Sequence, residues 1–270
     1  MLKRGLLGML VVGLGLVLAP RALAYNGSYV PGAGINNSVH DLGTPGGNGM
    51  NYNATPADAL TRKCIWCHAP HNTYKLSTVA IGGGLQAPSS AFDYLPLWNH
   101  DLTNFTTVFT MYTNGTGGPQ AATDPKALQA KGAMTPGNVS LLCLSCHDGS
   151  IAVNSYGNAG SQLAASVSVG TDKISPTYQI GKDKYLGNHH PIGFNYGTVQ
   201  AVDTEIRDAD LWLMTPTLPI SNYLSNGKVE CSTCHSVHNK GNGGERLLWR
   251  SDKNSELCLT CHDKGIYTAP

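Results

Sequence analysis

Four cysteine pairs of one spacing constrain this chain more than any other feature of its sequence. All eight cysteines belong to a C-x-x-C-H motif, and the motifs span residues 64–68, 143–147, 231–235 and 258–262. Residues i and i+3 lie on one side of a helical turn, so both thiols of a pair can reach one edge of a planar ligand. C-x-x-C-H is the attachment motif of haem c, in which two thioether bonds hold the porphyrin and the histidine ligates the iron. The sequence therefore predicts four haem c groups.

The predicted attachment residues are eight cysteines and four proximal histidines. They are Cys64, Cys67, Cys143, Cys146, Cys231, Cys234, Cys258 and Cys261, with His68, His147, His235 and His262. Two alternatives compete, because paired C-x-x-C units can make zinc sites of four cysteines and because cysteines in an exported chain can form disulfides. Neither alternative predicts a histidine directly after all four second cysteines, so haem attachment is favoured.

Several other side chains could ligate the second axial position of each iron. The remaining histidines are His40, His71, His100, His189, His190 and His238, and the methionines that could ligate are Met50, Met111, Met134 and Met214. Because the supply of imidazoles exceeds the need, two histidines per iron are favoured over His/Met ligation. The ligands that we expect are His40, His71, His100, His190 and His238.

The positions of these histidines narrow their roles. His71 and His238 each follow a proximal histidine by three residues, which is too few to pass around a porphyrin. Each is therefore expected to ligate a neighbouring haem, or else to be an exposed side chain that contacts a propionate. His190 precedes Pro191, which favours an extended backbone and a fixed loop ligand. Its neighbour His189 should then point elsewhere, because successive side chains of an extended chain face opposite ways.

The first 24 residues resemble a secretory signal peptide. Two basic residues precede an apolar run over 5–18, and Ala22-Leu23-Ala24 provides a small-residue cleavage site. The apolar run is short for a transmembrane anchor, which is the alternative. We therefore expect an exported protein, periplasmic or at the cell surface, without an integral membrane span after cleavage. Loss of Lys3, Arg4 and Arg21 leaves 15 basic and 17 acidic side chains, so the composition does not suggest a nucleic-acid partner.

The rest of the chain divides into an arm and a haem domain. Residues 25–54 form an N-terminal arm that is rich in Gly and Asn and carries His40, a candidate for an intermolecular haem ligand, and residues 55–270 form a tetrahaem domain. The motifs begin 79, 88 and 27 residues apart, which excludes a solenoid repeat. We expect a mostly irregular fold that is organised by haem, with short α-helices and few or no strands.

Short helices are expected at four places. One should run from Thr55 into the first motif, one over 125–131, one over 138–147 and one over 255–262 with Gly265 as its stop. Weak alternation over 150–225 allows a few short strands. Glycine clusters at 82–84, 115–119 and 241–244 predict loops.

A wider set of short motifs resembles a known family. Ser-Val-His40-Asp-Leu, Cys-Ile-Trp-Cys-His68-Ala-Pro-His71, Pro-Leu-Trp-Asn-His100, Cys-Leu-Ser-Cys-His147-Asp-Gly, Asn-His-His190-Pro-Ile, Cys-Ser-Thr-Cys-His235-Ser-Val-His238 and Leu-Cys-Leu-Thr-Cys-His262 are similar to segments of multihaem cytochromes c of the doubled C-x-x-C-H type. That family has Asp where His189 stands, which favours His190 as the ligand. The haem count and N-terminal histidine also resemble extracellular cytochromes that polymerise into conducting filaments through a histidine of the next subunit.

The resemblance and the ligand supply favour an electron carrier over an enzyme. Its partners would be other redox proteins or extracellular electron acceptors, with a homopolymer as the filament form. The alternative is a haem oxidoreductase that acts on nitrogen or sulfur oxyanions at an open iron. No haem motif ends in Lys, as one such reductase class requires. A third hypothesis is an electron-input subunit of a larger membrane complex.

Overall fold

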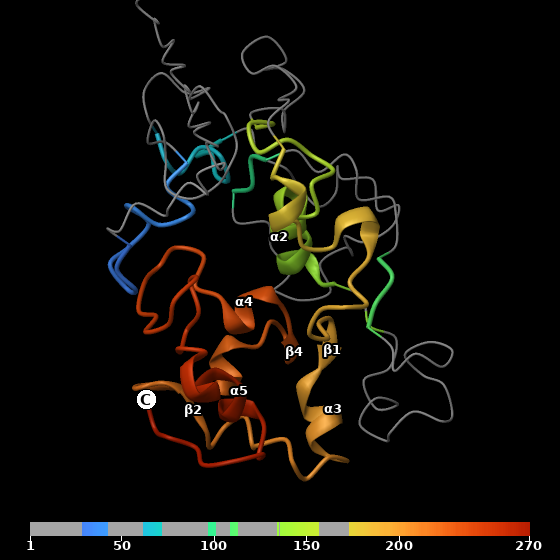
Figure 1. Ribbon diagram of the computed structural model, residues 1–270, viewed down its shortest axis with the longest axis vertical. Coiled ribbons are helices and arrows are strands. Elements are labelled where there is room, and N and C mark those ends of the chain that lie inside the picture. The colour runs from blue at the N-terminus through green and yellow to red at the C-terminus, as the bar shows by residue number, and fades with distance from the viewer. Residues whose placement is uncertain are drawn as a thin grey trace, which may run out of the picture.

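Turns and very short helices make up most of the part of the chain that the structure describes (Figure 1). The computed structural model describes residues 29–42, 62–71, 97–100, 109–112, 134, 136–156 and 173–270. Their α-helices are α2 (Asn138–His147), α3 (Tyr196–Gln200), α4 (Cys231–Cys234) and α5 (Glu256–Cys261). Their 3-10 helices are η1 (Pro176–Tyr178), η2 (Lys182–Lys184), η3 (Ile220–Tyr223) and η4 (Lys253–Ser255). None of the helices within these ranges has the length and apolar character needed to cross a bilayer.

Strands are few and form two separate two-stranded ribbons in the described ranges. β1 (Phe194–Asn195) pairs antiparallel with β4 (Lys228–Val229), with Phe194 opposite Val229. β2 (Leu213–Thr215) pairs antiparallel with β3 (Leu218–Pro219). The predicted fold class, mostly irregular with short helices and few strands, is confirmed.

The helices predicted at two of the haem motifs are present. The helix over 138–147 is confirmed by α2, and the helix toward residue 262 by α5. Gly265 is not the stop of α5, because the backbone is already extended at His262. The helix expected over 125–131, and the part of the first helix that precedes residue 62, lie outside the described residues. Residues 64–67 form turns.

Two clusters of buried apolar side chains hold these short elements together. The larger cluster gathers side chains from α2, β1, α3, η3 and β4, among them Leu141, Phe194 and Ile220. The smaller one joins Trp66 of the first motif to Tyr156, whose rings lie 4.9 Å apart. Cysteines lie at the edges of both clusters: Cys67 packs against each of them. The motifs are therefore anchored on apolar cores.

A buried carboxylate joins α2 to α4. Glu230 lies at the N-cap of α4 and is almost fully buried, and its two carboxylate oxygens accept from the Gly137 amide at 3.0 and 3.1 Å. The Ser140 hydroxyl also donates to this carboxylate and accepts from the Cys231 amide at 3.0 Å. The first turn of α2 and the start of α4 are thus held by one side chain. Figure 1 shows α4 between α2 and α5.

We predict that Glu230→Gln changes how stability depends on pH. Burial raises the pKa of Glu230 against the opposing effect of the hydrogen bonds from Ser140 and Gly137. A pKa that is higher in the folded than in the unfolded chain gives stability that is fully present below the ordinary Glu pKa and is lost as pH rises through the folded value. Glutamine does not titrate, so the melting temperature of the variant should rise relative to that of the wild type as the pH increases above the ordinary Glu pKa of about 4.

The matched control for this prediction is Glu245→Gln. Glu245 is exposed, and its pKa is lowered by hydrogen bonds from its own backbone amide and from Ser251. Its substitution should therefore produce no gain over the same pH range. A melting-temperature difference between wild type and Glu230→Gln that stays constant with pH would contradict the prediction.

Candidate haem-binding site

Each C-x-x-C-H motif forms one turn of helix that ends at its histidine. In the first, third and fourth motifs the histidine amide donates to the carbonyl of the first cysteine at 2.8, 3.1 and 2.9 Å, and in the second the motif forms the last turns of α2. This i to i−4 bond brings the two cysteines to one side of the turn. The chain therefore places two sulfurs on one side of the turn and an imidazole at its end four times over.

Three of the proximal histidines have another imidazole facing them. The ring centres of His68 and His238 are 6.1 Å apart, and those of His147 and His40 are also 6.1 Å apart. The ring centres of His262 and His190 are 6.3 Å apart. Two imidazoles that ligate one metal from opposite sides, each nitrogen about 2 Å from it, have ring centres about 6 Å apart.

The hydrogen bonds of these rings suit metal ligation. Nδ1 of His40 lies 2.9 Å from the Val237 carbonyl, and Nδ1 of His190 lies 2.9 Å from the Pro191 carbonyl. Nδ1 of His235 lies 3.2 Å from the Arg246 carbonyl. A carbonyl can only accept, so in each neutral ring Nδ1 carries the proton and Nε2 keeps its lone pair for a metal.

Burial favours the neutral imidazole of both histidines at the second motif, His147 and His40. It lowers the pKa of His147 to about 4, with further lowering by His40 and His235. Burial also lowers the pKa of His40, against the raising effect of its bond to Val237. Both imidazoles are therefore unprotonated at neutral pH, which is the state that ligates a metal.

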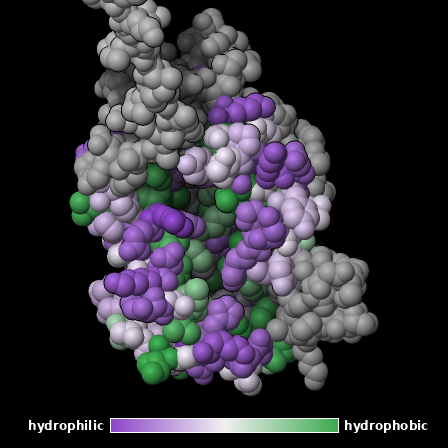
Figure 2. Space-filling model, in the orientation of Figure 1, coloured by the Kyte–Doolittle hydropathy of each residue, from purple (hydrophilic) through white to green (hydrophobic). Residues whose placement is uncertain are grey.

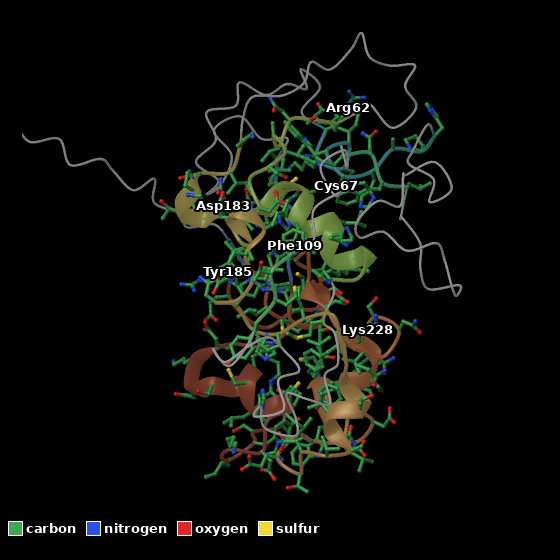
Figure 3. The ribbon with its side chains drawn as sticks, turned by 90° about the vertical axis from the view of Figure 1, so that its right-hand side faces the viewer. Arg62, Cys67, Phe109, Asp183, Tyr185 and Lys228 are labelled. Atoms are coloured by element: carbon green, nitrogen blue, oxygen red, sulfur yellow. The ribbon has the colours of Figure 1, made fainter. Side chains whose placement is uncertain are left out.

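The thiols follow the order of the motifs through the molecule. Cys67 lies near enough to Cys146 to raise the pKa of that thiol, Cys231 raises the pKa of Cys143, and Cys261 raises the pKa of Cys234. Successive motifs are thus neighbours in space. Figure 3 shows the first motif, marked by Cys67, above Phe109 of the larger cluster and below Arg62 at the outer edge.

The cysteines are free thiols rather than members of a thiolate cluster. No two of the eight form a disulfide. Burial raises the pKa of Cys67 and of Cys234 to about 12, so both are protonated at neutral pH. In the part of the chain that the structure describes, no three His, Cys, Asp or Glu side chains gather where they could hold one metal ion, although a zinc site of four cysteines requires such a group.

The other candidate ligands lie in different surroundings. His71 is exposed and His189 is half-buried. His100 is almost fully buried, with Nε2 at 2.9 Å from the Ala152 carbonyl and 3.2 Å from the Cys146 sulfur. Met111 and Met134 belong to the larger cluster and Met214 is fully buried, whereas Met50 lies outside the described residues. Among the described residues no imidazole is paired with His235 as the other three are paired.

Two buried arginines support the fourth motif. The Arg207 guanidinium donates to the Leu259 carbonyl at 3.0 Å, pairs with Asp263 at 2.8 Å and stacks 3.8 Å above the ring of Trp212. Arg250 donates to the Thr260 hydroxyl at 3.0 Å. These contacts fix the turn that carries the last two cysteines. Sequence reasoning did not find these arginines, because single basic residues far from a motif carry no signal of their partners.

The residues present fit a covalently bound haem. The chain offers paired thiols for the porphyrin edge, a proximal imidazole beside them and, at three motifs, a second imidazole at the spacing of one metal. Figure 2 shows hydrophobic side chains gathered in a recess between hydrophilic margins, as a large apolar ligand requires. When bound, haem supplies reversible one-electron chemistry, and the protein supplies attachment, axial ligands and surroundings.

Comparison with known proteins agrees with this geometry for one part of the chain. Residues 224–266 match the family model described as Doubled CXXCH motif, and this range covers the third and fourth motifs. No curated protein matches the chain. The match supports covalent c-type haem at these motifs and, at a coarse level, a multihaem c-type family. The third and fourth motifs are therefore similar to the doubled C-x-x-C-H segment of haem-binding electron-transfer cytochromes.

Proposed function

We propose that this chain is an exported electron carrier that holds four haems c, each ligated by two histidines. The observation that carries the proposal is the set of three imidazole pairs with centres 6.1 to 6.3 Å apart. Imidazole on both sides of an iron leaves no position for a substrate. The chemistry that remains is electron transfer, at the low potentials expected without a methionine ligand.

The proposed axial pairs follow the observed geometry. His68 pairs with His238, His147 with His40 and His262 with His190. The first pair joins the first motif to the loop of the third, as the short spacing between His235 and His238 predicts for a neighbouring haem. His71 follows His68 by three residues, as His238 follows His235. If the two motifs exchange these histidines, His71 is the ligand of the iron at His235, and we assign it there. His100 stays a ligand candidate from sequence alone.

Ligands exchanged between motifs support rapid transfer among the haems. A histidine that is bonded to one iron and tethered three residues from another brings the two groups close together. The mutual effects of the thiols on their pKa values, from the first motif to the second, the second to the third and the third to the fourth, also support neighbouring haems. We propose that electrons cross the molecule along this sequence of neighbouring haems.

The cellular setting rests on the N-terminal sequence. We propose that residues 1–24 direct export and that the mature carrier serves periplasmic or extracellular respiration, with other redox proteins or external acceptors as partners. The filament form assigned the bridging role to His40. Within one chain His40 lies beside His147 and bonds to Val237, which favours a carrier in which His40 ligates a haem of its own chain.

A reductase is the second candidate function. The third motif favours it, because no described imidazole is paired with His235 as at the other three motifs. An open iron there would give nitrogen or sulfur oxyanions a place to bind. Carbon monoxide and cyanide distinguish the two proposals, since they change the spectrum of an open haem and leave a wholly six-coordinate protein unchanged.

We predict that the mature protein carries four haems. Its intact mass should exceed that of the residue 25–270 polypeptide by four haem groups. The double variant Cys143→Ala/Cys146→Ala should lose about a quarter of the haem absorbance, because C-x-x-C-H supplies one attachment site each time. If the count of four is wrong, the intact mass and the haem absorbance of the wild type will both correspond to fewer than four haems. A colourless, zinc-containing protein would overturn the whole proposal.

We also predict that His190→Ala opens one iron. One haem should become five-coordinate and high-spin, bind carbon monoxide and return to low spin on addition of imidazole, since His190 faces His262. The matched control is His189→Ala, which removes the adjacent imidazole and should leave the spectrum low-spin. Identical spectra for the two variants, measured by visible absorption and electron paramagnetic resonance, would contradict the assignment.

A further inference from the structure

We propose that the side chain of Asn239 is a positioning residue for the distal ligands of two haems, His40 at the second motif and His238 at the first. The inference rests on the proposed function, because it takes both histidines as axial ligands. It goes further by naming the group that places both of them. Asn239 belongs to neither pair and lies outside all four motifs.

The side-chain amide of Asn239 is fully buried and is used at both ends. Its oxygen accepts from the Gly32 amide at 3.1 Å, and its nitrogen donates to the carbonyls of Val30 and Gly34 at 2.9 and 2.8 Å. The backbone carbonyl of Asn239 accepts from the Gly34 amide at 2.6 Å. One residue thus holds the segment 30–34 against the loop that follows the third motif.

This contact fixes the path of the chain toward His40. From Gly34 the chain makes two turns, in which the Ser38 amide bonds to Ile35 and the Asp41 amide bonds to Ser38. Asp41 then forms an ion pair with Lys63 at 2.8 Å, next to the first motif. His40 therefore lies on a short segment that is anchored at Asn239 on one side and at Lys63 on the other.

The same residue also closes the turn that carries His238. The backbone amide of Asn239 donates to the Ser236 carbonyl at 2.9 Å. The Ser236 hydroxyl in turn donates to the Lys240 carbonyl and accepts from the Lys240 backbone amide. Asn239 adopts a positive φ of 50°, which Asn tolerates better than most residues. His238 projects from this turn toward His68.

The segment from His235 to His238 therefore contributes groups to three of the four motifs. His235 at its start is the proximal ligand of the third motif, the Val237 carbonyl within it binds Nδ1 of His40, and His238 faces the first motif. Removing the side-chain amide of Asn239 takes away the donor to the Gly34 carbonyl and the acceptor of the Gly32 amide, so the loop of His238 loses its attachment to residues 30–34, which is costly. Alanine also tolerates the positive φ of this turn less well than Asn. Both distal histidines should then loosen together, although they face different motifs.

The test uses the mature holoprotein and the variant Asn239→Ala. We expect haem content to stay at the wild-type value while up to two of the four haems gain high-spin character and bind carbon monoxide. Imidazole should restore the low-spin spectrum, and the potentials of the affected haems should rise. The control is Asn195→Ala, since Asn195 is exposed and its side-chain oxygen accepts from the Thr198 amide at 3.0 Å at the start of α3. It should leave the spectrum unchanged.

Combination with ligand variants separates positioning from general damage. In a His40→Ala background, Asn239→Ala should add a second open haem. In the double His40→Ala/His238→Ala background it should add none, because both of its targets are already gone. A third open haem there, or a wild-type spectrum and wild-type potentials for Asn239→Ala alone, would overturn the proposal.

A second variant keeps the test decisive if alanine prevents folding. Asn239→Asp keeps the size and the acceptor for Gly32 but removes the donor to Val30 and Gly34, so the same two haems should open. Failure of the proposed function gives a different result. In that case the wild type itself would lack four haems or would be partly high-spin before any substitution.

Discussion

The arrangement depends on imidazole rings that face one another across a gap of 6.1 to 6.3 Å. Each facing pair joins a helical turn that bears two cysteines to a loop from another part of the chain. If both rings of a pair ligate one haem iron, as we propose, the pair would cross-link distant segments of the chain.

The loop after the third motif has the largest role in this network. It places His238 against the first motif and offers the Val237 carbonyl to His40, and Asn239 ties it to the N-terminal segment. Glu230, at the N-terminal end of α4, likewise joins two segments, because its carboxylate accepts hydrogen bonds from the start of α2. The third motif is thus connected to the first two through polar contacts that no motif encodes.

The chemical parts of the site could be predicted from the sequence because each is local. The C-x-x-C-H spacing predicts a turn at each motif, and the sequence around the second and fourth motifs predicts the helices α2 and α5 that carry them. The stop of α5 could not be predicted from Gly265, because the chain leaves the helix at His262, where the backbone is extended.

What the sequence by itself determined is the ligand inventory, namely eight thiols, four proximal histidines and a surplus of distal candidates. Only the tertiary structure decided which imidazole faces which. His40 lies 107 positions before His147, and His238 lies 170 positions after His68. A local sequence pattern cannot predict which of two histidines so far apart in the chain will lie together. Their pairing depends on the turns and on buried polar contacts, such as those of Asn239, that bring distant segments side by side.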